Sequence, residues 1–150
     1  MKKVAILIPA ISLLFFSCGN TSNEKSKEQS ETVSNKEYLH NHEIQTINLN
    51  KGEKWLVETT MLSLIRKMER EVLDFDQQSF TQLGHQLSSD VEELTSNCTM
   101  TGQAHDELHK WLLPYIDLVD SLTQTNDQKE ARALYQQIKQ SFHTFNQYFK

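Results

Sequence analysis

Apolar residues recur every three or four positions through residues 53–150, the spacing that gathers them on one face of an α-helix. Short polar or glycine-containing breaks divide this pattern, and we expect helices over residues 53–75, 78–97, 103–123 and 128–150. Pro114 falls inside the third stretch and is expected to kink or shorten that helix. Amphipathic helices joined by short turns predict an all-α fold, an antiparallel up-down four-helix bundle.

Each helix contributes one apolar stripe to the expected core, and neighbouring members of a stripe are three or four residues apart. The second stripe ends on Cys98, so this thiol is expected to face the core. The predicted core residues are Met61, Ile65, Met68, Val72, Phe75, Phe80, Leu83, Leu87, Val91, Leu94, Leu108, Leu112, Tyr115, Val119, Leu122, Ala131, Leu134, Ile138, Phe142, Phe145 and Phe149.

The part of the chain before these helices has two further sections. Residues 43–50 alternate apolar and polar positions around Ile47 and Leu49, which predicts a short extended segment followed by a turn. Residues 18–42 are polar with almost no large apolar side chains, so we expect a disordered tether there. Residues 43–150 form the single predicted domain.

The first 17 residues have the features of an export signal, because a lysine pair precedes an apolar run too short for a comfortable membrane span. Residues 14–19, LFFSCG, resemble a bacterial lipobox, with Phe15 as a departure from the aliphatic residue usual there. The resemblance implies cleavage before Cys18 and attachment of lipid to it. The chain would then be exported and anchored to the cell envelope, to the outer membrane rather than the inner one, with its domain in the periplasm or at the cell surface. The alternative is an ordinary cleaved signal or a short membrane helix.

Composition restricts both the fold class and the partners that we expect. The chain has only four glycines and two prolines, which disfavours an all-β fold rich in tight turns. With 15 basic and 20 acidic residues its formal net charge is −5, so nucleic acid is not an expected partner. The expected contacts are the membrane, through the N-terminal lipid, and an envelope protein.

Residues 98–109 hold the densest set of metal-ligating side chains, Cys98, Met100, His105 and His109. Cys98 ends the second predicted helix and His105 begins the third, so an up-down bundle brings them to the same end. The two histidines are four residues apart and project from one helix face, which lets two imidazoles bind one ion. Thiolate, thioether and imidazole together suit Cu(I), and without the thioether they suit Zn(II). With Cys18 lipidated, Cys98 is the remaining thiol.

These residues also have plain structural explanations. Cys98 can be a small core residue, Met100 an apolar plug, and the histidines surface side chains. Asp106 and Glu107 either orient a ligand histidine or are first-turn acidic residues favoured by the helix dipole. We do not expect an enzyme, because a Cys98 nucleophile with His105 as its base lacks an evident oxyanion site and an orienting partner. Haem is not an expected cofactor, since the chain has no CxxCH motif.

Three motifs give the chain a family resemblance: INLNKGEKW at residues 47–55, CxMxGxxHxxLHxWLxP at residues 98–114, and the tail YFK at residues 148–150. They resemble small bacterial exported or lipoprotein helical proteins that are largely uncharacterised. The resemblance implies a helical bundle and a heavy-metal connection, and it supplies no activity. We therefore expect a lipid-anchored envelope bundle that binds copper or zinc at one end. The alternative is a non-catalytic interaction or structural lipoprotein without a metal.

Overall fold

The computed structural model of the chain describes residues 45–150, so the predicted signal, the lipidation site Cys18 and the tether to residue 42 lie outside the described residues. The described part contains the helices α1 (Thr59–Leu73), α2 (Phe80–Ser96), α3 (Gln103–Gln124) and α4 (Gln128–Tyr148). Between residues 45 and 150 the only β structure consists of isolated bridges. The all-α prediction is confirmed.

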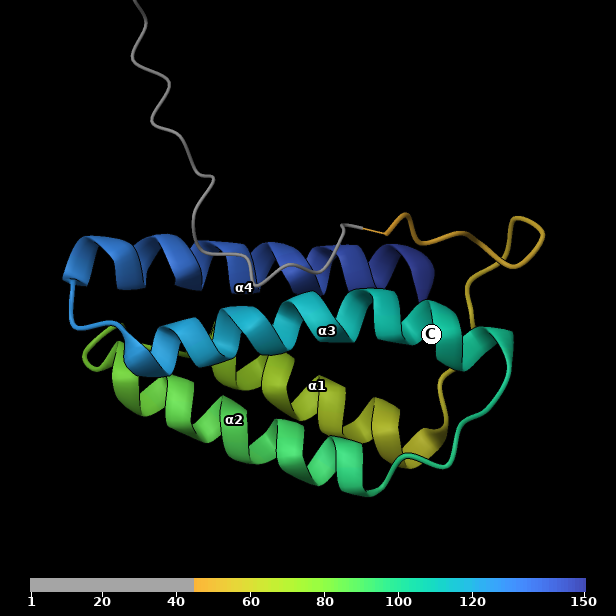
Figure 1. Cartoon of the computed structure of the whole chain (residues 1–150), viewed down its shortest axis with the longest axis horizontal. Helices are drawn as coiled ribbons and strands as arrows, with labels where there is room; N and C mark the ends of the chain where they lie inside the picture. Colours follow the sequence, from red (N-terminus) through yellow and green to blue (C-terminus); the bar gives the residue numbers. More distant parts are fainter. Residues whose placement is uncertain (1–44) are drawn as a thin grey trace, which may run out of the picture. The chain divides into compact units, whose positions relative to one another are not determined.

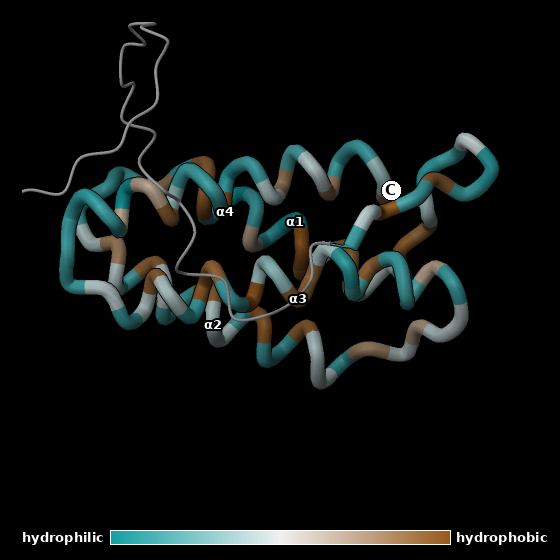
Figure 2. Tube along the Cα trace, turned by 45° about the horizontal axis from the view of Figure 1, so that its top comes forward, coloured by the Kyte–Doolittle hydropathy of each residue, from teal (hydrophilic) through white to brown (hydrophobic). Residues whose placement is uncertain are grey.

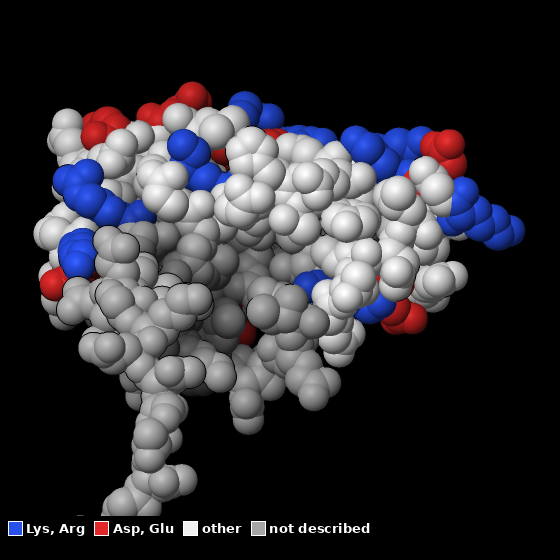
Figure 3. Space-filling view, turned by 90° about the horizontal axis from the view of Figure 1, so that it is seen from above, with Lys and Arg blue, Asp and Glu red and all other residues white. Residues whose placement is uncertain are grey.

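Successive helices run back and forth, so that each connection lies at the opposite end of the bundle from the one before it (Figure 1). α1 packs against α2 and α4, and α3 packs against the same two helices. This is the four-helix bundle expected from the sequence. Apolar and hydrophilic positions alternate along the helices (Figure 2), and among residues 45–150 no helix is both long and apolar enough to cross a membrane. On the face in Figure 3, charged side chains of both signs lie around a largely uncharged area.

The predicted apolar stripes form one hydrophobic core. Every predicted core residue is buried except Phe75, which is half-buried. Two aromatic residues of the helices that the stripes left out, Trp111 and Tyr135, also join the core. Trp111 stacks on Tyr115 with ring centroids 5.1 Å apart, and the Tyr135 hydroxyl donates a hydrogen bond to the Val72 carbonyl at 2.9 Å. Burial of this apolar surface is the main term that holds the helices together.

The prediction for the start of the first helix was wrong, because α1 begins only at Thr59. The Glu58 carboxylate accepts hydrogen bonds from two backbone N–H groups of the first turn, at 2.9 and 3.2 Å, and so caps the helix. The residues before it are extended and pair with residues 148–150. The Trp55 N–H donates to the Tyr148 carbonyl at 2.8 Å, and the Lys150 N–H donates to the Trp55 carbonyl at 2.8 Å. These non-local bonds exclude a helix there.

The other three helices begin and end within two residues of their predicted bounds. α2 begins at Phe80 with Ser79 as its N-cap, and α4 begins at Gln128 with Asp127 as its N-cap. α3 continues through Pro114 to Gln124, so the proline does not shorten it.

Residues 45–58, called the N-terminal segment below, are extended and lie against the bundle. Ile47, Trp55 and Val57 are buried, whereas Leu49 is 41% exposed. The expected alternation of Ile47 and Leu49 on one face therefore fails at Leu49, which directly precedes the turn at residues 50–53. Two residues in that turn have positive φ angles, and one of them is a glycine. α1 begins directly after this segment, at Thr59.

Candidate metal site

The α2–α3 connection, residues 97–102, is a loop at one end of the bundle (Figure 1). The Asn97 N–H donates to a carbonyl of the last turn of α2 at 3.2 Å, and the Cys98 N–H donates to the Thr95 carbonyl at 3.3 Å. Gly102 comes directly before α3 with a φ of 72°, in the left-handed region that favours glycine. The chain reverses direction here within a few residues, which brings the end of α2 and the start of α3 to the same end of the bundle.

Cys98 and Met100 lie on this connection. Both side chains are half-buried and pack against the hydrophobic core. Cys98 is a free thiol. The predicted alignment of Cys98 with the core is thus present, and the position suits a side chain that covers the end of the core. The ligand assignment of both sulfur atoms stays a prediction.

His105 and His109 come into contact in the first turns of α3. Their ring centroids are 4.2 Å apart and the ring planes meet at 63°, as the four-residue spacing predicts. His105 is half-buried and His109 is exposed. Desolvation, and then the positive charge that His105 can carry, lower the pKa of His109 against the opposite effect of Asp106. His109 therefore favours the neutral imidazole, the form that binds a metal ion.

The structure assembles only part of the predicted ligand set. Among residues 45–150, no three histidine, cysteine, aspartate or glutamate side chains are grouped closely enough to hold a metal ion. His105 and His109 are in contact, but Cys98 does not join them as a third ligand. A complete protein site for copper or zinc needs the α2–α3 connection to close onto this pair.

Glu107, one of the two carboxylates considered for orienting a histidine, binds the N-terminal segment. It is 4% exposed; its Oε2 accepts from the Asn48 N–H at 2.9 Å and its Oε1 accepts from Lys110 Nζ at 2.8 Å. Lys110 also donates to the Thr46 carbonyl at 3.3 Å. Burial alone would raise the pKa of Glu107, but the hydrogen bonds from Lys110 and Asn48 outweigh it and lower that pKa. Asp106 lies in the first turn of α3, where the helix dipole favours a negative charge.

Replacing Glu107 by alanine is expected to loosen the N-terminal segment around Asn48 and to lower the free energy of unfolding by about 1–3 kcal/mol, because two partly buried donors, the Asn48 N–H and Lys110 Nζ, lose their acceptor. Hydrogen exchange at the Asn48 N–H measures the release, and we expect it to become roughly tenfold faster. Glu107→Gln keeps an acceptor for Asn48 and should have a smaller effect. Asp120→Ala, at an exposed position of α3, is the control. Equal protection of Asn48 in Glu107→Ala and the parent chain would contradict the assignment.

An ionic cluster between α1 and α2 could not be identified from the sequence. Asp90 is 2% exposed, and its Oδ1 accepts from Lys67 Nζ at 2.8 Å and from Gln86 Nε2 at 3.2 Å. Burial, followed by a hydrogen bond with Asp90 and its negative charge, raises the pKa of Glu71 to about 7. Within residues 45–150, Glu71 Oε2 and Asp90 Oδ2 are buried without a hydrogen-bond donor. One proton shared between Glu71 and Asp90 would satisfy both of these oxygen atoms.

The sequence signal for this cluster is a pair of four-residue spacings, Lys67 with Glu71 and Gln86 with Asp90, each on one helix face. Such spacings are also common on solvated helix faces, so the pattern alone does not predict burial.

Comparison of the chain with protein-family models, with curated proteins and with solved structures gave no match. Function has to be inferred from the side chains themselves.

Proposed function

We propose that this protein is a lipid-anchored helical bundle of the cell envelope that binds one copper or zinc ion at the α2–α3 end of the bundle. The supporting observation is the contact of His105 with His109, whose ring centroids are 4.2 Å apart. Two imidazoles at this spacing on a helix can bind one borderline metal ion. The lowered pKa of His109 adds support, because a metal ion then competes less with protons for that ring.

Cys98 and Met100 complete the coordination in this proposal. Both lie on the short connection directly before α3 and are only half-buried. Two imidazoles and a thiolate suit tetrahedral zinc, and a thioether beside them favours Cu(I). In this proposal, residues 97–102 rearrange so that the two sulfur atoms turn from the core toward the histidines.

The lipid anchor is the other part of the proposal and rests on the lipobox-like residues 14–19. Lipid on Cys18 and the polar residues that follow it would hold the bundle at the envelope, at the outer membrane rather than the inner one. The exported environment is oxidising, and a thiolate that binds a metal ion there is protected from forming disulfides with other chains.

Metal titration of the purified chain under reducing conditions should give about one Cu(I) or Zn(II) per chain. Replacing His105 or His109 by alanine is expected to weaken metal binding by roughly tenfold or more, because each change removes one of the two imidazoles that are in contact. Cys98→Ser should weaken Cu(I) binding more than Zn(II) binding, since copper prefers the softer ligand. His85→Ala, at an exposed position of α2, is the matched control and should bind like the parent chain.

Two results would contradict the metal proposal. The first is a parent chain that binds neither ion more tightly than the His105→Ala variant. The second is unchanged binding in a chain that carries both Cys98→Ala and His105→Ala.

A non-catalytic interaction protein without a metal is the second candidate. It is favoured by Leu56, which is 71% exposed on the N-terminal segment between the buried Trp55 and Val57. Backbone bonds from Trp55 and Val57 to residues 148–150 fix the segment, so that Leu56 stands out from it. An exposed leucine on an extended segment offers a contact for an envelope protein. A chain that binds no metal would make this the better-supported function.

A further inference from the structure

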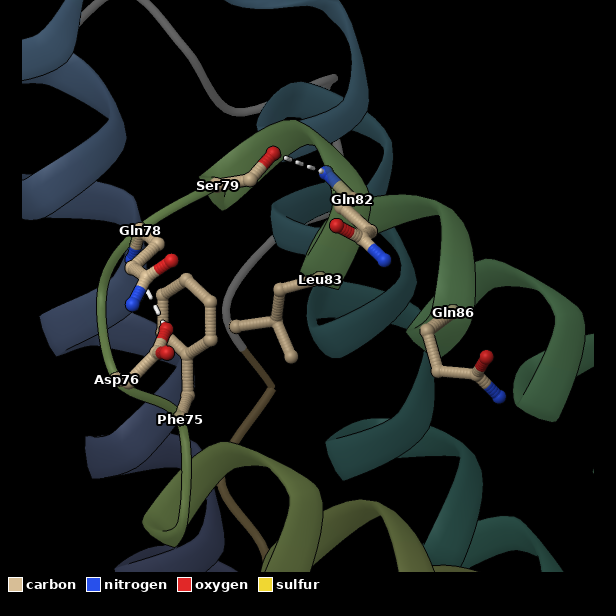
Figure 4. A pocket seen from close by; sticks show the side chains of 7 residues that line it. All are labelled: Phe75, Asp76, Gln78, Ser79, Gln82, Leu83 and Gln86. Carbon is tan, nitrogen blue, oxygen red and sulfur yellow. Dashed lines mark hydrogen bonds between the residues drawn. The ribbon is translucent and has the colours of Figure 1, made fainter.

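A cavity of about 350 Å³ opens beside the α1–α2 connection, at the opposite end of the bundle from the histidine pair (Figures 1 and 4). Its lining comes from that connection and from the first turns of α2. The lining residues are Phe75, Asp76, Gln78, Ser79, Gln82, Leu83 and Gln86.

Local sequence explains why polar side chains gather around this cavity. Gln82 and Gln86 are four residues apart on one face of α2, and Gln78 lies on the connection directly before the Ser79 N-cap. The Ser79 hydroxyl accepts from the Gln82 N–H at 3.3 Å and caps the helix, and Asp76 Oδ1 accepts from the Gln78 N–H at 3.0 Å (Figure 4). These bonds fix the backbone that bears the glutamines.

The inner wall of the cavity is apolar and rigid. Leu83 is buried, and its side chain points toward the Phe75 ring (Figure 4). Phe75 is half-buried and packs edge-on against Phe80 and Tyr135, with ring centroids 5.3 and 5.6 Å away. The aromatic ring is therefore held in place by the core before any ligand arrives.

The chemistry of the lining restricts the ligand. The lining contains three amides, one carboxylate and one hydroxyl, with no lysine or arginine. An anionic ligand such as a phosphate would meet no cation among the lining residues and would be repelled by Asp76. Glutamine both donates and accepts hydrogen bonds, so neighbouring amides match neighbouring hydroxyl groups on a ligand.

We propose that this cavity binds a neutral, hydroxyl-rich ligand, a sugar of one or two rings. The exposed amides of Gln78 and Gln82 would bind its hydroxyl groups, and Phe75 with Leu83 would contact its apolar face. Gln86 borders the site and is held by its hydrogen bond to Asp90. The volume lies at the lower end of the roughly 300–1,000 Å³ range of small-molecule sites, which fits a ligand of this size.

Saturation-transfer NMR on the full chain, purified in a detergent without a sugar headgroup, tests the proposal. The probes are glucose, maltose, N-acetylglucosamine and its β-1,4 disaccharide, with EDTA present so that metal plays no part. We expect saturable transfer to at least one of these sugars. A chain with Gln78→Ala and Gln82→Ala should bind it roughly tenfold or more weakly, because each change removes one amide that bonds the ligand.

The matched control carries Gln136→Ala and Gln137→Ala, two exposed glutamines of α4, and should bind like the parent. The His105→Ala chain should also bind the sugar like the parent chain. The sugar proposal can therefore hold even if the metal proposal fails. No transfer from any of the sugars at about 10 mM would overturn the sugar proposal. Equal binding by the parent and the Gln78→Ala, Gln82→Ala chain would also overturn it, because the ligand would then lie elsewhere.

Discussion

Replacing Gly84 by valine is expected to lower the free energy of unfolding by about 3 kcal/mol or more and to loosen the packing of α2 against α3. Gly84 is buried on α2, and a Cβ atom placed there would lie 3.0 Å from Thr123 N and 3.1 Å from the Leu122 carbonyl carbon. Both of these atoms belong to the backbone of α3. The contact can therefore be relieved only by moving one helix away from the other.

Gly84→Ala is the sharper test, because two effects oppose each other. Alanine is favoured over glycine inside a helix by about 1 kcal/mol, whereas overpacking a tight contact costs about 1–3 kcal/mol. We expect a net loss of stability, since the close neighbours on α3 include backbone atoms that cannot turn aside. Urea unfolding followed by circular dichroism measures the difference.

Ser89→Ala is the control for Gly84→Ala, because Ser89 is exposed on the same helix and the change alters helix propensity without a new contact. It should be neutral or slightly stabilising. A Gly84→Ala chain at least as stable as the parent would show that α2 and α3 are not held at the distance the structure gives.

The helices were predictable because burial repeats within each of them. Ile65, Leu87, Tyr115 and Ile138 are all fully buried at their expected stripe positions. The residues that set this pattern are three and four apart in the chain, so the sequence displays them directly. By the same local criterion a glycine inside a helix is a weak point, and only the neighbouring α3 backbone explains why Gly84 stands in α2.

The start of α1 could not be predicted, because its determinants are far apart in the sequence. The pattern of residues 53–58 is compatible with a helix, but Trp55 pairs with Tyr148 and Lys150. Likewise, Glu107 bonds Asn48 across 59 residues of chain. No periodicity within a segment reveals a partner at that separation.

The candidate site was likewise predictable only in part. The contact of His105 with His109 depends on spacing within one helix and was predicted. The position of Cys98 relative to them depends on the path of the α2–α3 connection, and helical spacing does not determine that path. The pairing of Glu71 with Asp90 depends on how α1 and α2 are aligned, which the two separate patterns leave open.

A fall in stability with rising pH is the second large effect we expect, and it arises at Glu71. The pKa of Glu71 is raised from 4.5 to about 7, first by burial and then by Asp90, against the opposing charges of Lys67 and Arg70. Because the folded chain holds this proton more tightly than the unfolded chain, stability from this group is greatest below pH 4.5. It is lost as the pH rises from 4.5 through about 7. Solvent reaches part of Glu71, so we expect a loss of about 1–2 kcal/mol.

Glu71→Gln resembles the protonated carboxyl at every pH, so it should match the parent chain near pH 4.5 and be more stable above about pH 7. Urea unfolding across that range gives the difference between the two curves. The difference isolates Glu71, since other groups titrate in both chains. The lowered pKa of His109 has the opposite effect on stability. This group makes the folded chain more stable as the pH rises toward 6.5, the ordinary pKa of a histidine side chain.

Glu92→Gln, at an exposed position of α2, is the matched control and should follow the parent curve. If the difference between Glu71→Gln and the parent stays constant from pH 4.5 to 7, Glu71 carries no proton in that range. Lys67 would then be the ionic partner of both carboxylates, and Glu71→Gln should destabilise the chain at neutral pH. The sign of the Glu71→Gln effect above pH 7 therefore decides between a shared proton and a lysine held by two charged carboxylates.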